Sequence, residues 1–318
     1  MPGCDDEDMS AALLIVPGVI AAAIGGELFV RGAVGGANRL RIAPGIVGAT
    51  VAAFATSSPE MSVGINAATA GRPEIALGDA LGSNVVNIGL VLGIAVLLGG
   101  LQTRRADVVR DVPTALVAPL LVVLLAWDDA ISRADGAVLL IAFTAWLVIT
   151  IRQAARERSA TAAVLADRTM GRVIRDSVVG LVLLILAGRL IVLAAGGIGE
   201  LLGWDPFTVG ALLVAVATSV PELATVVVAR LRGHDEISLG TVLGSNIFNG
   251  LLIIGVAAII QPIGIVGAEF AAAIVASIVT LLIVIPRRSG RLHPVRGALL
   301  LATYAAYVIV LLAIHGST

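Results

Sequence analysis

The sequence predicts an all-α membrane protein in which ten transmembrane helices form two inverted five-helix repeats, with the N- and C-termini outside. Three observations lead to this prediction. Hydrophobic residues make up 58% of the chain and the mean hydropathy is +1.03, whereas soluble domains contain about 45–50% apolar residues. The chain holds ten apolar segments of spanning length. Two polar motifs inside these segments recur at a fixed offset.

The apolar segments follow one another with short polar connections. A span needs about 20 apolar residues, and we expect helices near 11–34, 44–70, 74–99, 112–127, 134–151, 173–196, 206–230, 236–259, 262–285 and 294–314. The first segment lacks the basic region of a signal peptide, so we expect it to be retained. Residues 1–318 then form a single membrane domain. It divides into a first repeat (11–151), a cytoplasmic connection (152–172) and a second repeat (173–315).

The placement of arginine predicts the orientation. All 21 basic residues are arginine. If the N-terminus lies outside, the cytoplasmic connections hold Arg39, Arg41, Arg104, Arg105, Arg110, the six arginines from Arg152 to Arg175, Arg230, Arg232, Arg287, Arg288, Arg291 and Arg296. The opposite connections hold only Arg72 and Arg133. The positive-inside rule therefore places both termini outside, in a multi-pass protein of the cell (cytoplasmic) membrane.

The remaining composition excludes several classes of function. A net charge of −1 argues against binding nucleic acid, and the single cysteine, Cys4, excludes an intramolecular disulfide and a cysteine metal site. We expect no cofactor and no obligatory protein partner apart from the lipid bilayer.

Two polar stretches interrupt apolar segments and match each other. A-T-S-S-P-E at 55–60 and A-T-S-V-P-E at 217–222 are 162 residues apart, and 22 of 47 positions match between 44–90 and 206–252. Each repeat has five spans, an odd number, so the second copy enters the membrane from the opposite side. Inverted repeats are typical of transporters that bind substrate near the bilayer midplane. A duplicated scaffold is the alternative, but the matches concentrate on polar residues that a scaffold would avoid.

The polar residues of the motifs predict a cation site. Pro59 and Pro221 should break their helices and free carbonyl oxygens. Glu60 and Glu222 would repel each other unless one binds a proton or a cation lies between them. On the following spans, serine and asparagine lie four residues apart, on one helix face. Because the candidate ligands are all oxygens, the pattern favours Ca²⁺ and Na⁺ over zinc and copper.

Two pairs of motifs resemble the two alpha-repeats of the cation/calcium exchanger superfamily, specifically its prokaryotic-type sodium/calcium exchanger branch. They are A-T-S-S-P-E with G-S-N-V-V-N, and A-T-S-V-P-E with G-S-N-I-F-N. The resemblance covers both repeat cores and the ten-span plan. It implies a secondary active antiporter that exchanges Na⁺ for Ca²⁺ by alternating access, with the first and sixth spans as sliding helices. The ion ligands that it implies are Ala53, Thr56, Ser57, Glu60, Ser83, Asn87, Ala215, Thr218, Ser219, Glu222, Ser245 and Asn249.

The chain departs from the family pattern at four positions. Ala55 and Ala217 replace glycine, Asp79 stands where asparagine is common, and Asn249 replaces an acidic residue found in several relatives. Relatives that cotransport K⁺ carry aspartate at the position of Asn249, so the resemblance implies transport that does not need K⁺. Two carboxylates balance one Ca²⁺ or two Na⁺, and further oxygen ligands leave room for another Na⁺, which predicts electrogenic exchange.

Several alternatives stay open. A proton/calcium exchanger could use the same two glutamates, although such relatives show G-N-x-x-E in place of T-S-x-P-E. A passive channel would conduct without a counter-ion. An intramembrane hydrolase using Ser57 or Ser83 would lack a histidine or lysine to activate the serine, so we expect no enzyme.

Three charged residues outside the ligand set have two interpretations each. Asp79 is either a carboxylate facing the ion pathway or the acceptor of an inter-helix hydrogen bond. Glu27 and Arg189 occupy equivalent positions in the two repeats. They either form ion pairs that change with the transport state or extend to the water interface.

Overall fold

The computed structural model describes residues 15–40, 44–157, 170–202, 205–265, 267–286 and 290–315, and these are mostly helical. Each of the ten predicted ranges contains helix. Among the described residues, seven helices are long and apolar enough to cross a membrane, and an eighth crossing results if the bent pair Pro206–Thr218 and Val220–Leu231 is taken as one span. The protein is therefore a multi-span helical membrane protein.

The elements alternate between long helices and helices divided into short pieces, including π-helical segments labelled η. The first half contains α2 (Ile15–Leu40), α3 (Pro44–Val47), η1 (Gly48–Ala52), α4 (Ala53–Thr56), α5 (Ser58–Thr69), α6 (Pro73–Val85), η2 (Val86–Leu92), α7 (Gly93–Leu97), α8 (Arg105–Leu125) and α9 (Arg133–Glu157). The second half contains α10 (Met170–Leu202), α11 (Pro206–Thr208), η3 (Val209–Val214), α12 (Ala215–Thr218), α13 (Val220–Leu231), α14 (Asp235–Ile247), η4 (Phe248–Ile253), α15 (Ile254–Ile260), α16 (Gly267–Val284) and α17 (Pro294–His315).

Helix α8 starts earlier than the sequence predicts. The apolar pattern begins at residue 112, but the helix begins at Arg105. The preceding turns contain charged residues that compensate one another: the Arg110 guanidinium lies 2.6 Å from an Asp111 oxygen and 3.3 Å from an Asp107 oxygen. A criterion based on apolar residues excludes such turns, whereas paired charges can be buried inside a helix.

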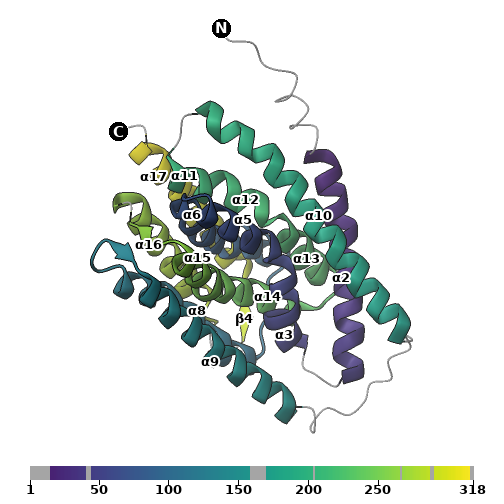
Figure 1. The fold of residues 1–318 in the computed structure, drawn as a ribbon. Helices are drawn as coiled ribbons and strands as arrows, with labels where there is room; N and C mark the ends of the chain where they lie inside the picture. Colours follow the sequence, from purple (N-terminus) through teal and green to yellow (C-terminus); the bar gives the residue numbers. More distant parts are fainter. Residues whose placement is uncertain are drawn as a thin grey trace.

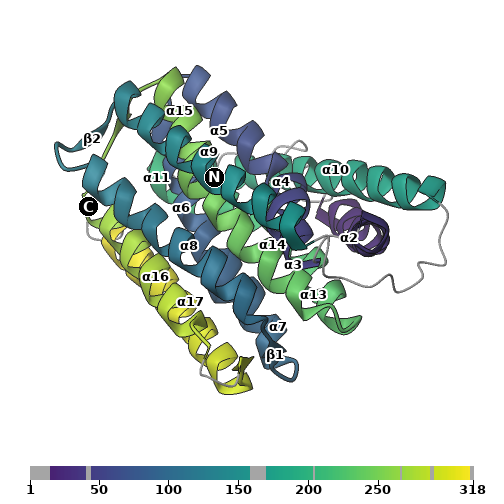
Figure 2. The same cartoon turned by 90° about the horizontal axis from the view of Figure 1, so that it is seen from below.

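The helices form an inner group and an outer group. Within the inner group, 83% of the apolar 18-residue stretch in Pro73–Leu97 and 78% of that in Asp235–Ile260 is buried, whereas only 22% of that in the outer span Pro294–Ile314 is. Outer helices present leucine, isoleucine and valine to their surroundings, as Leu120 and Leu124 of α8 do. Such an apolar exterior suits hydrocarbon. Helices α2 and α10 lie side by side at one edge of the bundle (Figures 1 and 2).

Two short antiparallel sheets join the two halves of the chain. Strand β1 (Leu101–Gln102) pairs with β4 (Arg291–Leu292), and β2 (Ala130–Ile131) pairs with β3 (Ile263–Gly264). Because β1 precedes α8 and β2 follows it, the two sheets lie at opposite ends of a helix that is roughly 30 Å long. Strands β3 and β4 flank α16 in the same way.

Glycines bring the inner helices of the two halves into close contact. A Cβ atom added at Gly82 would lie 2.5 Å from the backbone oxygen of Ala211, and one at Gly244 would meet the backbone of Ala49 in the same way. These glycines belong to the patterns G-D-A-L-G at 78–82 and G-T-V-L-G at 240–244, in which small residues four positions apart permit close helix approach. Beside this contact, the Asn246 amide donates to the Asn84 carbonyl at 3.0 Å, and these two residues are themselves 162 positions apart.

Candidate ion-binding site

Both motif helices break where the prolines predict. Helix α4 ends before Ser57 and α12 ends before Ser219, and these serines have φ/ψ angles of −83°/10° and −79°/2°. The second break bends the chain by 41°. Proline follows in the first turn of α5 and α13, where its missing N–H needs no partner. Each break therefore brings a helix C-terminus and a helix N-terminus together.

The motif glutamates lie in the first turns of α5 and α13. Glu60 and Glu222 have no exposed surface. Both oxygens of Glu60 and Oε2 of Glu222 lack a hydrogen-bond partner among the described residues. The positive ends of the two helix dipoles favour negative charge at these positions. The arrangement holds two carboxyl groups away from water with several oxygen lone pairs unused.

Near the two glutamates, hydroxyl groups of one repeat contact polar groups of the other repeat. Ser57 and Ser245 both donate to Oε1 of Glu222, each at 3.3 Å. The hydroxyls of Thr56 and Ser245 are 3.4 Å apart, and those of Ser83 and Thr218, their equivalents at the offset of 162, are 3.3 Å apart. The structure thus brings the predicted hydroxyl ligands of the two motifs into one buried cluster.

The predicted amide ligands lie on the π-helical segments. Asn87 is on η2 and Asn249 on η4, and both are fully buried. Neither amide has a hydrogen-bond partner among the described residues. A π-helical segment inside an α-helix often marks a functional site. A buried amide without a partner is costly, which indicates that something outside the described chain satisfies it.

The predicted backbone ligands, the carbonyl oxygens of Ala53 and Ala215, also accept hydrogen bonds within their own motifs. The carbonyl of Ala53 accepts the Ser57 N–H at 2.9 Å, and that of Ala215 accepts the Ser219 N–H at 3.1 Å. A carbonyl oxygen has two lone pairs, and each of these oxygens also lies near a threonine hydroxyl, Thr56 at 3.4 Å from Ala53 and Thr218 at 3.3 Å from Ala215. The Ser219 hydroxyl is buried and has no partner among the described residues.

Asp79 is a third buried carboxylate in the cluster. Its side chain is fully buried, and Oδ1 accepts from Ser83 at 3.3 Å and from Thr218, on the other repeat, at 3.2 Å. The contact with Thr218 is the inter-helix hydrogen bond of Oδ1, whereas Oδ2 is buried without a hydrogen-bond partner among the described residues. Ser57 and Ser83 both donate to carboxylates, and no histidine is among their partners.

The donor set suits a hard cation held by mixed oxygen ligands. Among the described residues, no three His, Cys, Asp or Glu side chains gather into a metal-binding group. An ion here would therefore need hydroxyl, amide and carbonyl oxygens in addition to carboxylates. Ca²⁺ accepts such a mixture of oxygen ligands in flexible geometry.

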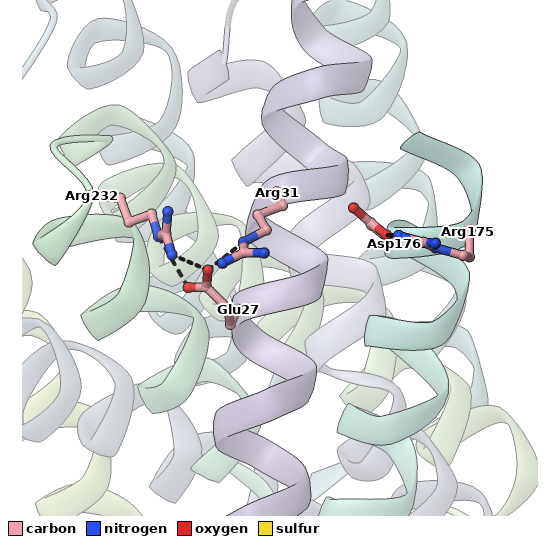
Figure 3. Close-up of polar contacts among 5 residues, drawn as sticks. All are labelled: Glu27, Arg31, Arg175, Asp176 and Arg232. Carbon is pink, nitrogen blue, oxygen red and sulfur yellow. Dashed lines mark hydrogen bonds and ion pairs between the residues drawn. The ribbon is translucent and has the colours of Figure 1, made fainter. Parts of the chain in front are cut away.

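A second polar group ties α2 to the rest of the bundle. Glu27 accepts hydrogen bonds from Arg31 of its own helix and from Arg232 at the end of α13, where the Nε–Oε2 distance is 3.1 Å (Figure 3). Glu27 thus forms an inter-helix ion pair in this conformation. The side chain of Arg189 lies outside the described residues. Figure 3 also shows the neighbouring pair on α10, in which Arg175 contacts Asp176 at 2.7 Å.

The sequence interpretation missed one buried charged group. Arg110, Asp107 and Asp111 of α8 are almost inaccessible and contact one another. No repeated motif marks them. A charged pair at adjacent positions next to an apolar run was the only available signal.

Comparisons with known proteins agree with this arrangement. The family model described as "Sodium/calcium exchanger protein" matches residues 10–152 and 177–313. A protein of Alkalimonas amylolytica provisionally named as an antiporter, CaxA, is 32% identical, with 93% of this chain and 97% of that protein covered. The inner membrane protein YrbG of Escherichia coli strain K12 is also 32% identical, with 80% and 81% covered.

A solved structure shows the same likeness in three dimensions. The structure of the sodium-calcium exchanger NCX_Mj soaked with 100 mM Na⁺ and 10 mM Sr²⁺ matches with a TM-score of 0.77 and 27% identity, covering 95% of this chain and 98% of that one. The family match spans most of the chain and includes both motifs. The chain therefore belongs to the sodium/calcium exchanger protein family.

Proposed function

We propose that this protein is an electrogenic, K⁺-independent antiporter that exchanges Na⁺ for Ca²⁺, and that it has no enzymatic activity. One observation carries the proposal. Glu60 and Glu222, one from each repeat, are fully buried, and three of their four oxygens lack partners among the described residues. Buried carboxylates of this kind need a cation or a proton. The exchange named for NCX_Mj supports Na⁺ and Ca²⁺ as the transported ions.

The ions bind, in this proposal, between the broken helices of the two repeats. Carboxylates contribute charge, hydroxyls and amides contribute neutral oxygens, and the helix C-termini before Ser57 and Ser219 contribute carbonyls, as half-helices do in other transporters. The proposed ligands are Ala53, Thr56, Ser57, Glu60, Ser83, Asn87, Ala215, Thr218, Ser219, Glu222, Ser245 and Asn249.

The repeats are inverted, in the proposed architecture of ten spans, and the termini lie outside. The pairing of the strands supports the inversion. Gly93 and Gly255 occupy equivalent positions at the offset of 162, which makes β3 the equivalent of β1. Yet β1 and β3 belong to sheets at opposite ends of α8. Equivalent loops at opposite ends are what an inverted relationship requires, and the arginine distribution then sets both termini outside.

Alternating access would involve α2 and α10, the first and sixth spans. Their place at the edge of the bundle supports this assignment (Figure 1). The cell membrane is the proposed location, supported by the name of the relative YrbG as an inner membrane protein.

Ca²⁺ uptake into proteoliposomes tests the proposal. We expect an outward Na⁺ gradient to drive uptake with K⁺ replaced by choline on both faces. Uptake driven by a pH gradient and not by Na⁺ would instead identify the protein as a proton/calcium exchanger that uses the same glutamates. A requirement for K⁺ would contradict the interpretation of Asn249, which offers an amide oxygen and no charge.

A further inference from the structure

Asp79 is the one carboxylate of the buried cluster that the proposed ligand set leaves out. Its equivalent in the second repeat is Thr241, whose hydroxyl is buried and has no partner among the described residues. The two halves of the cluster therefore differ in one acidic group. Asp79 lies beside the proposed ligands and contacts two of them, Ser83 and Thr218.

The contacts of Asp79 indicate a different role. Oδ1 receives the hydroxyls of Ser83, at 3.3 Å, and Thr218, at 3.2 Å. A hydroxyl has one proton and two lone pairs, so it can bind a cation only if its proton points elsewhere. Oδ1 accepts from both hydroxyls at once, so both protons point to one side-chain oxygen and the hydroxyl lone pairs remain for a cation.

The alternative acceptor for both protons is itself a proposed ligand. The Ala215 carbonyl lies 3.5 Å from the Ser83 hydroxyl and 3.3 Å from the Thr218 hydroxyl. Without Asp79, either hydroxyl can donate to this oxygen and occupy the lone pair that remains beside the Ser219 N–H. Asp79 thus determines whether three oxygens face an ion or face one another.

The equivalent pair of hydroxyls, those of Thr56 and Ser245, is oriented by different groups. Thr56 donates to the Ala52 carbonyl, at 3.1 Å, and Ser245 donates to Glu222. The site therefore contains two equivalent hydroxyl pairs: Thr56 and Ser245 donate to a backbone carbonyl and to the proposed ligand Glu222, whereas Ser83 and Thr218 both donate to Asp79.

We propose that Asp79 is a positioning residue of the ion site, which orients Ser83 and Thr218 so that their lone pairs and that of the Ala215 carbonyl face a bound cation. The proposal rests on the proposed function as an ion exchanger. The proposal distinguishes two properties of Asp79, accepting a hydrogen bond and carrying a charge. Asp79→Asn keeps an acceptor oxygen, whereas Asp79→Ala removes it. Thr241→Ala is the matched control, because it alters the equivalent position without touching this network.

The test measures the Na⁺ dependence of Ca²⁺ exchange by the reconstituted full chain. We expect Asp79→Ala to raise the Na⁺ concentration for half-maximal exchange by about tenfold or more, the effect of losing two hydrogen bonds, with a maximal rate within about twofold of the unmodified protein. Asp79→Asn and Thr241→Ala should stay within about threefold in half-maximal concentration. If Asp79 had only a structural role, Asp79→Ala would lower thermal stability, and it would not change the half-maximal Na⁺ concentration separately from the maximal rate.

Ion-dependent thermal stabilisation of the purified protein gives a second readout, because a ligand that binds the folded state raises its melting temperature. Na⁺ should stabilise Asp79→Asn as it does the unmodified chain, and Asp79→Ala less. Equal impairment of Asp79→Asn and Asp79→Ala, or no effect of Asp79→Ala, would overturn the proposal. If Asp79→Ala does not fold, an impaired Asp79→Asn still overturns it. Absence of Na⁺-driven exchange in the unmodified protein would refute the proposed function, while Na⁺ and Ca²⁺ stabilisation would still test Asp79.

Discussion

Neutralising either motif glutamate is expected to abolish Ca²⁺ transport while leaving a folded protein. Glu60→Gln removes no hydrogen bond seen among the described residues, since neither oxygen has a partner. In Glu222→Gln the amide oxygen can still accept hydrogen bonds from Ser57 and Ser245, whose hydroxyl oxygens lie 3.3 Å from Oε1 of Glu222. Both substitutions preserve volume, so neither should disturb the packing of α5 or α13.

The size of the effect follows from burial. Both side chains are fully inaccessible, so a bound Ca²⁺ would keep only one of the two glutamate charges in a site shielded from bulk solvent. Removing one partner of a buried charge pair costs about 3–5 kcal/mol, which corresponds to a roughly 150- to 5,000-fold weaker interaction with Ca²⁺. At Ca²⁺ concentrations that half-saturate the unmodified protein, uptake should then fall to background.

Uptake of radioactive Ca²⁺ into proteoliposomes with an outward Na⁺ gradient measures this loss. Size-exclusion chromatography in detergent checks that the variants are folded. Glu74→Gln is the matched control: it is the same substitution in the first turn of α6, where we expect only the small helix-dipole contribution of about 0.3–1 kcal/mol to stability to be lost. Near-normal uptake by either Glu60→Gln or Glu222→Gln would show that the site is assigned wrongly.

Three further outcomes are expected. Arg110→Leu should lower stability by about 3–5 kcal/mol, because it leaves the inaccessible Asp111 without its 2.6 Å partner; thermal denaturation in detergent would reveal it, and unchanged melting would contradict the pairing. Gly82→Ala should force α6 away from η3 and abolish exchange, because its Cβ would lie 2.5 Å from the Ala211 oxygen; normal transport would show that the helices can separate without harm. Exchange should generate a current that reverses with the Na⁺ gradient, recorded on solid-supported membranes, and insensitivity of uptake to membrane potential would refute electrogenic transport.

The sequence by itself determined the class of protein and the chemistry of its motifs. Hydropathy located helix in all ten expected ranges, because crossing hydrocarbon demands long apolar helices. Proline in the two motifs predicted breaks that the structure shows beside Ser57 and Ser219, since a residue without an N–H cannot continue the helical hydrogen bonds. These properties are local, and a local pattern suffices to predict them.

Only the tertiary structure decided which polar groups meet. The donation from Thr218 to Asp79 joins residues 139 positions apart, and no spacing in the sequence distinguishes a carboxylate that orients hydroxyls from one that faces an open pathway. The ion pair of Glu27 with Arg232 spans 205 positions, and the charged first turns of α8 contain the buried contact between Arg110 and Asp111. Charges and hydroxyls are compatible with many partners, and the close contact of the glycine-lined helices selects among them.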